Sequence, residues 1–208
     1  MKLLLATALV AATASAQTIF YSFDPYLSAG VYGVVVVDYA EYNGTVANIF
    51  SSFDFSSWSS LNDSEALDLC SEDAAGLHYD PLKACGPYSE HADSEACKSK
   101  KYSCTPESYA KDPLSCEKGD FSGKFGNVVL DEDYYFDDEV TDENYPRFSE
   151  NMPLWNIVLR ASCGNTSPPL ACAVGRQFID SDYYDDSDVG SEANEQHKRR
   201  KHRKHHKH

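Results

Sequence analysis

The 208-residue sequence predicts an all-β fold, an antiparallel sandwich or barrel, from three observations. Several short runs rich in β-branched and aromatic residues are separated by turn residues. Asn43-Gly44, the strongest local hairpin signal, stands between two of these runs. No helical segments alternate with the runs, as they would in a parallel βαβ sheet. The pattern therefore favours consecutive antiparallel strands.

The predicted strands are short. Residues 31–38 are dominated by valine, and a turn at 42–44 leads to a second apolar run at 45–55. The remaining strands are predicted at residues 19–23, 125–130, 154–161 and 170–174. The pattern supports one helix, at residues 64–69, with Ser64 as its candidate cap.

Two segments do not have a strand pattern. Residues 78–120 are rich in Cys, Pro, Ser, Lys and Glu, and a loop of that length is expected to be functional or held by disulfides. Residues 131–143 contain eight acids in thirteen positions, and we expect them to form a solvated loop. Their spacing matches no calcium-loop motif.

The two ends of the chain predict its compartment and its domain limits. One lysine, an apolar run and Ala14-Ser15-Ala16 predict a cleavable secretory signal over residues 1–16. We expect a β domain at 17–178, an acidic linker at 179–196 and a basic tail at 197–208. No other apolar run is long enough to cross a membrane. The protein is expected to be secreted, either extracellular or associated with the cell wall.

Covalent modifications follow from that compartment. Seven cysteines in a secreted chain predict a disulfide framework with one thiol left over. Sequons at Asn43, Asn62 and Asn165 predict a glycoprotein, and Pro168 makes the third the weakest of them.

Charge is distributed unevenly along the chain. Residues 197–208 hold seven Lys/Arg and five His, which leaves 11 of the 18 basic residues against all 33 acidic ones, a formal charge of −22. An acidic body excludes nucleic-acid binding through its own field. The tail supports three alternatives: attachment to anionic cell-wall or surface polymers, a merely solvated tail, and metal capture. The histidines concerned in metal capture are His202, His205, His206 and His208.

Three segments together resemble the copper/zinc superoxide dismutase family, most closely its extracellular copper-only fungal type. Cys70 is followed by Gly76-Leu77-His78-Tyr79-Asp80-Pro81, which is similar to the family's cysteine and H-[FYL]-[ND]-P segment. The stretch from Cys116 to Gly126 resembles C-x-x-G-D-L-S-G-K-H-G. Residues 155–160 and 170–173 stand where the family has a strand ending V-I-H and then R-L-A-C.

The resemblance covers residues 19–176 and implies a fold and a disulfide. The family fold is an eight-stranded Greek-key β-barrel, here with a long disulfide-stapled loop and a disordered C-terminal tail. The family pattern also implies a bridge between Cys70 and Cys172. For the other cysteines, the pairs Cys104–Cys116 and Cys85–Cys97 are favoured, which leaves Cys163 over.

The copper ligands of the family are largely missing from this chain. The family holds copper with an early H-x-H pair, the histidine of H-x-x-P and the histidine of V-I-H, and imidazole suits both oxidation states of copper. This sequence has no histidine before His78, and Arg160 stands at the fourth position. A guanidinium has no lone pair to give a metal. Pro169 replaces the family's anion-guiding arginine.

A weaker metal site is a second possibility. Of the zinc-side ligands Asp120 is present, and Glu117 stands where a histidine would be. His91 lies in the cysteine-rich loop, so His78, His91 and Asp120 could hold a divalent ion. The alternative is that His78 hydrogen-bonds a neighbour and His91 is solvated.

The resulting hypothesis is a superoxide-dismutase-like pseudoenzyme, an extracellular structural or binding module with no catalytic residue expected. The first alternative is a copper-binding superoxide dismutase with a non-standard site using His78. The second is metal binding by the tail alone. No cofactor is assigned, and copper remains the candidate.

Overall fold

The computed structural model describes residues 17–58, 70–150, 155–163 and 167–177. The predicted helix at 64–69, the signal segment, the sequons at Asn62 and Asn165, and the linker and tail from 179 lie outside these ranges. No helix in the described part of the chain is long and apolar enough to cross a membrane.

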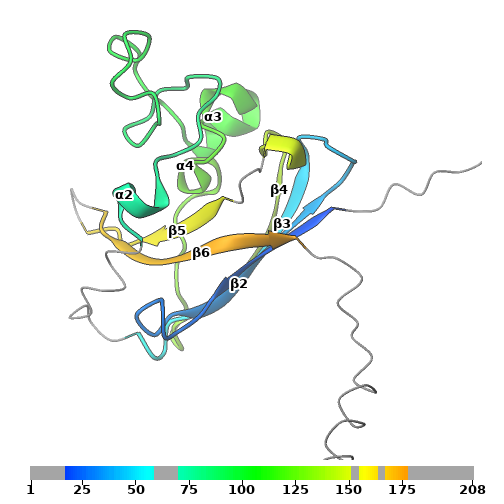
Figure 1. The fold of residues 1–208 in the computed structure, drawn as a ribbon, viewed down its shortest axis with the longest axis vertical. Coiled ribbons are helices and arrows are strands. Elements are labelled where there is room, and N and C mark those ends of the chain that lie inside the picture. Colours follow the sequence, from blue (N-terminus) through cyan, green and yellow to red (C-terminus); the bar gives the residue numbers. More distant parts are fainter. Residues whose placement is uncertain (1–16, 59–69, 151–154, 164–166, 178–208) are drawn as a thin grey trace, which may run out of the picture. The chain divides into compact units, whose positions relative to one another are not determined.

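Six strands form one antiparallel sheet in the order β4-β3-β2-β1-β6-β5 (Figure 1). The strands are β1 (Thr18–Phe23), β2 (Tyr32–Tyr39), β3 (Ala47–Asp54), β4 (Tyr135–Asp142), β5 (Asn156–Arg160) and β6 (Pro169–Gln177). The predicted all-β class is confirmed. The described residues supply six of the eight strands that the resemblance implies.

The β2–β3 hairpin forms where Asn43-Gly44 predicted it. The Gly44 amide donates to the Glu41 carbonyl at 3.0 Å, and Asn43 has a φ of +54°. Asparagine tolerates this left-handed conformation better than most residues. In register, Val37 lies opposite Ile49 and Val35 opposite Ser51.

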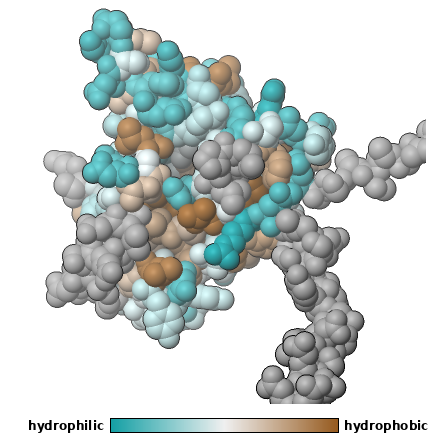
Figure 2. Space-filling model, in the orientation of Figure 1, coloured by the Kyte–Doolittle hydropathy of each residue, from teal (hydrophilic) through white to brown (hydrophobic). Residues whose placement is uncertain are grey.

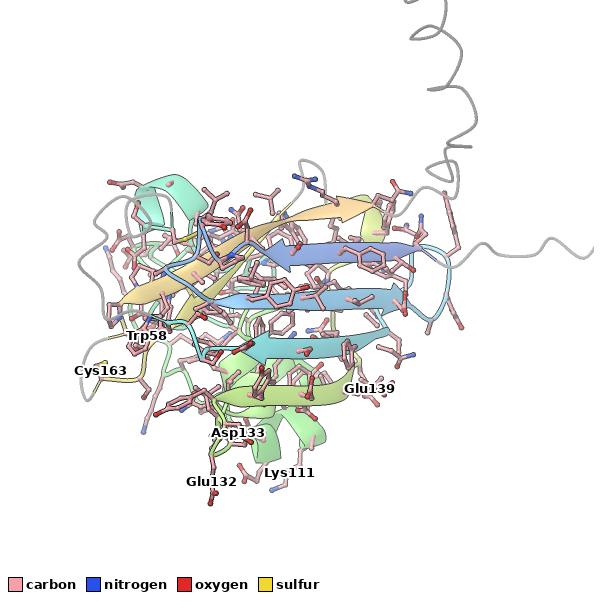
Figure 3. All side chains as sticks on the ribbon, turned by 90° about the horizontal axis from the view of Figure 1, so that it is seen from below. Trp58, Lys111, Glu132, Asp133, Glu139 and Cys163 are labelled. Carbon is pink, nitrogen blue, oxygen red and sulfur yellow. A yellow bond between two sulfur atoms is a disulfide. The ribbon has the colours of Figure 1, made fainter. Side chains whose placement is uncertain are left out.

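Alternate residues of the central strands build the core. Ile19, Tyr21 and Phe23 of β1 are at most 1% exposed, because strand side chains point to opposite faces in turn. Three short helices are also present: α2 (Glu72–Ala75), α3 (Pro106–Lys111) and α4 (Phe121–Phe125), of which α4 packs Phe121 against this core. Phe121 stacks on Tyr145 with ring centroids 6.0 Å apart. Figure 3 shows α3 and α4 behind the sheet.

Two sequence predictions are wrong. Residues 125–130 form no strand, because Asp120 caps α4 by accepting from the Gly123 amide at 2.8 Å, and Val129 remains 77% exposed. Residues 131–143 are not simply a loop, because β4 pairs with β3 along its length. Phe136 and Val140 of β4 turn inward while the carboxylates of residues 137–139 are exposed, a pattern that suits an edge strand.

Two of the three disulfides lie within the cysteine-rich segment, which Figure 2 shows as largely hydrophilic, and the third joins residue 70 to β6. The pairs are those that were favoured: Cys70–Cys172, Cys85–Cys97 and Cys104–Cys116. Cys163 is exposed and lies outside these three bridges. The first bridge closes a loop of 102 residues, and the other two close loops of 12. Two disulfide-closed loops thus constrain the long segment that the sequence predicts to be held by disulfides.

Two further 3₁₀ turns complete the described elements. They are η1 (Pro113–Ser115) and η2 (Phe148–Glu150). Glu150 of η2 accepts from the Tyr79 hydroxyl at 3.2 Å and from the Lys118 ammonium at 3.0 Å.

Candidate functional site

His78 is held by its backbone against the cysteine-rich segment. Its amide donates to the Tyr88 carbonyl at 2.8 Å, and its carbonyl accepts from the Glu90 amide at 3.1 Å. Asp80, two residues on, is 1% exposed and organises the facing turn. Its carboxylate accepts from the Ala84 and Cys85 amides and the Ser89 hydroxyl, at 2.7 to 2.8 Å. The His-x-Asp-Pro segment therefore fixes the histidine's position before any ligand is considered.

Glu117 is the buried partner of His78. Its Oε2 lies 2.7 Å from His78 Nδ1, and its side chain is 0% exposed while that of His78 is 26% exposed. A carboxylate accepts only, so an N–H at Nδ1 donates this bond and Nε2 becomes the lone-pair nitrogen. Buried carboxylates orient imidazoles in this way in many metal and catalytic sites.

The other oxygen of Glu117 is buried and accepts no hydrogen bond from any described residue. The backbone at Gly86 passes so close that a Cβ added there would lie 2.2 Å from Glu117 Oε1. A glycine is therefore required at position 86. An unsatisfied buried carboxylate oxygen is costly, so it marks a site that stores strain or receives a water molecule, an ion or another ligand.

Asp120 completes the acidic side of the cluster. Its Oδ1 accepts from the Ser122 hydroxyl and the Gly123 amide, and its Oδ2 accepts from the Tyr102 hydroxyl at 2.6 Å. Burial, with the hydrogen bond to Asp120, raises the pKa of Tyr102 far above its usual value of 10. Tyr102 is therefore a permanent donor, and its oxygen accepts from the Glu117 amide at 3.2 Å. The Cys104–Cys116 bridge brings these two segments together.

His78, Glu117 and Asp120 can each offer one ligand atom, and the three atoms lie within 4.8 Å of one another. Two carboxylates and one imidazole suit a divalent ion such as zinc. However, both Asp120 oxygens already accept hydrogen bonds, and Glu117 Oε2 is engaged by His78. Among the carboxylate oxygens of the cluster only Glu117 Oε1 accepts no hydrogen bond from a described residue, so an ion bound by both carboxylates would have to displace existing bonds.

A cation and an aromatic ring occupy the other side of His78. The Tyr88 ring centroid lies 5.5 Å from that of His78, and the Arg160 guanidinium carbon lies 4.9 Å from the Tyr88 centroid. Arg160 sits at the end of β5, where it donates to the Ser167 carbonyl at 3.2 Å and lies 3.9 Å from Glu72. In this Arg160–Tyr88–His78 stack the Tyr88 ring contacts the imidazole and also a permanent positive charge.

The sequence-predicted residues divide into those brought together and those left apart. His78 and Asp120 lie in one cluster, as the weaker metal hypothesis required. His91 does not join it, because its imidazole is 34% exposed and lies 3.8 Å from Glu90. The tail histidines lie outside the described residues. Glu117 was noted only as a histidine replacement, and nothing in the sequence pointed to Tyr88.

Of the predicted glycan sites, Asn43 alone can be placed. Its Oδ1 accepts from the Ser149 amide at 3.0 Å, and the residue is half-buried at the β2–β3 turn. Glycosylation there remains a prediction.

Comparisons with known proteins give only distant likenesses. No protein-family model matches the chain, and no curated protein sequence matches it significantly. Two solved structures of Candida albicans superoxide dismutase 5 do resemble it, one a glutamate-to-glutamine and the other a glutamate-to-alanine mutant. They are 15% and 14% identical, cover 79% and 77% of this chain and 93% and 88% of their own, and each has a TM-score of 0.39. Site residues cannot be carried over between proteins at such low identity.

Proposed function

We propose that this chain is a secreted superoxide-dismutase-like domain without copper-dependent catalysis, acting outside the cell as a structural or binding module. The observation that carries the proposal is the Arg160–Tyr88–His78 stack. A redox copper site needs several imidazoles around one point, and here one imidazole contacts a tyrosine ring that an arginine also contacts. The residues present therefore do not fit copper.

Charge and ligand supply both oppose copper at this position. The described part of the chain contains two histidines, His78 and His91, and they do not share a cluster. Arg160 is only 18% exposed, so its charge is weakly screened by water. This charge lies against the Tyr88 ring, which in turn contacts the His78 ring. The Glu117 carboxylate attracts a cation, but from the opposite, Nδ1 side of the ring.

The test is copper stoichiometry and superoxide dismutation by the secreted protein. To exclude any copper held by the tail histidines, the protein is compared with a variant whose five tail histidines are alanine. We expect the variant to hold no copper after mild loading and to have no dismutase activity. One copper per chain with activity would overturn the proposal and support a site built on His78.

A second candidate function is binding of a redox-inert divalent ion at His78, Glu117 and Asp120. It is favoured by one observation, the buried and unsatisfied Glu117 Oε1. Calorimetric titration with zinc separates this candidate from the first. Zinc binding that is lost in both His78→Ala and Glu117→Gln, but kept in His91→Ala, would establish it.

The basic tail has its own part in the proposal. Residues 197–208 would attach the domain to anionic cell-wall or surface polymers, while metal capture by the same segment is the alternative. Removing residues 197–208 should abolish binding to an anionic polysaccharide column and leave the metal content of the β domain unchanged. Retained binding to the column would contradict the attachment role.

A further inference from the structure

The outer face of β2, β3 and β4, turned away from the core, alternates exposed aromatic rings with carboxylates. Figure 3 looks onto this face, with the helices behind it and Glu139 labelled on the edge strand. The three rings are Tyr32, Phe50 and Tyr135, which are 63%, 42% and 44% exposed. The carboxylates are Asp54, Asp137 and Glu139.

Strand register shows that these side chains are neighbours. Asp54 lies opposite Tyr32 on one side and opposite Tyr135 on the other. Phe50 lies opposite Glu139. Asp137 follows Tyr135 by two positions, and residues two apart in a strand share a face. Each of the three carboxylates is thus next to an exposed ring on one continuous surface.

Charged residues on an edge strand have an ordinary explanation, since they prevent unwanted pairing of sheet edges. That explanation accounts for Asp137 and Glu139 but not for the rings. Three large aromatic side chains left this exposed on neighbouring strands form a surface typical of an interaction site. The rings therefore point to a partner.

The charge of the surroundings indicates which partner. Residues 17–58 and 126–146 contain no Lys, Arg or His, and they contain twelve acids. Arg176 of β6 lies opposite Phe20 of β1, and β1 separates its strand from β2. The face is thus unable to attract an anionic partner and is complementary to a cationic one.

We propose that the outer face of β2–β3–β4 docks an extended arginine-rich polypeptide segment. A guanidinium stacks flat on an aromatic ring and also binds a carboxylate through two parallel hydrogen bonds. A surface on which Glu139 lies opposite Phe50, and Asp137 follows Tyr135 by two positions, offers both contacts to one side chain. The inference gives a partner class to the binding module proposed above and rests on that role.

The test uses the full secreted chain and a fluorescent arginine–glycine repeat peptide, with affinity measured by anisotropy at near-physiological salt. Two double variants remove the contacts: Tyr32→Ser with Tyr135→Ser, and Asp137→Asn with Glu139→Gln. We expect each to weaken binding by about fivefold or more, from two lost cation–π or ionic contacts.

Matched controls separate the surface from general electrostatics. Asp93→Asn with Glu95→Gln makes the same charge change in the Cys85–Cys97 loop, and Tyr26→Ser removes a ring that is 93% exposed in the turn before β2. Both controls should stay within about twofold of the unmodified chain, since neither removes a contact of the face. Far-UV circular dichroism confirms that each variant folds.

Three results would overturn the proposal. They are no binding by the unmodified chain, no loss in the tyrosine double variant, or a loss in Asp137→Asn with Glu139→Gln that the control Asp93→Asn with Glu95→Gln equals. The copper and dismutase assays are run on the same preparations. An active copper site together with intact peptide binding would refute the loss of catalysis and leave the docking surface standing. If the protein neither dismutes superoxide nor binds the peptide, the docking surface is refuted and the proposed loss of catalysis is not.

Discussion

The buried Lys124–Asp142 ion pair is expected to be a principal electrostatic contribution to the stability of this domain. Both side chains are 0% exposed, and Nζ lies 2.7 Å from Oδ2. Lys124 also donates to the Lys118 carbonyl at 2.9 Å, and Asp142 accepts from the Tyr109 hydroxyl and the Asn144 amide. The pair joins α4, which begins after Asp120, to the edge strand β4.

Asp142→Asn removes the negative charge with almost no change of shape. The Lys124 ammonium would then be buried against carbonyl oxygens alone. Burial already lowers the pKa of Lys124, and the Asp142 charge is the main effect that opposes it. Leaving one charge of a buried pair uncompensated costs about 3–5 kcal/mol of unfolding free energy. Lys124→Met should cost less, about 2–3 kcal/mol, because two donors still serve the carboxylate.

The measurement is guanidinium unfolding followed by tryptophan fluorescence, with the disulfides intact. The double variant Lys124→Met with Asp142→Asn should be more stable than Asp142→Asn alone, because no uncompensated charge remains in it. As a control, Glu95→Gln breaks the exposed Lys98–Glu95 pair, which is 63% and 88% exposed, and should cost less than about 1 kcal/mol. Additive losses, or an Asp142→Asn loss no larger than the control, would refute the argument.

Three further predictions concern the site, pH and the tail. Gly86→Ala should cost about 1–3 kcal/mol and cost less in a Glu117→Ala background, because its Cβ would meet Glu117 Oε1; equal losses would contradict the contact. For Glu150, burial by itself would raise the pKa. The hydrogen bonds from the Arg147 amide and the Lys118 ammonium outweigh burial, so the pKa is lowered from its usual value of 4.5. Its stabilisation is therefore present above pH 4.5 and lost as pH falls through the folded-state value. Lys118→Met should therefore destabilise the protein at neutral pH and much less at about pH 3, as measured by denaturant midpoints. Finally, binding of the full chain to an anionic polysaccharide should tighten as pH falls through about 6.5, where the tail histidines become charged, and a flat profile would contradict it.

The candidate cluster owes its geometry to the cysteine-rich segment more than to the sheet. Tyr102 and Glu117 flank the Cys104–Cys116 bridge, while Gly86 and Tyr88 follow Cys85 of the second bridge. His78 is fastened between them through the Tyr88 and Glu90 backbone. Removing either small bridge should therefore disturb the cluster before it disturbs β1, β2 and β3.

Patterns with a local physical cause could be predicted from the sequence. Strands β1, β2, β3, β5 and β6 follow from runs of β-branched and aromatic residues, and the β2–β3 turn follows from Asn43-Gly44. The two disulfides of 12-residue separation join cysteines that are close in the chain. The Cys70–Cys172 bridge came from the family resemblance instead, because its partners are 102 residues apart.

Features that depend on distant partners were decided by the tertiary structure. The acidic residues of β4 have low strand propensity, and they form a strand because β3 offers a hydrogen-bonding edge and the core accepts Phe136. His91 lies apart from His78 although both are in the same segment. The backbone of residues 88–90 hydrogen-bonds to His78, whereas the His91 side chain is 34% exposed. Arg160 could be identified as a non-ligand from its chemistry alone. Its stacking on Tyr88 brings together residues 72 positions apart, and local pattern contains no information about such contacts.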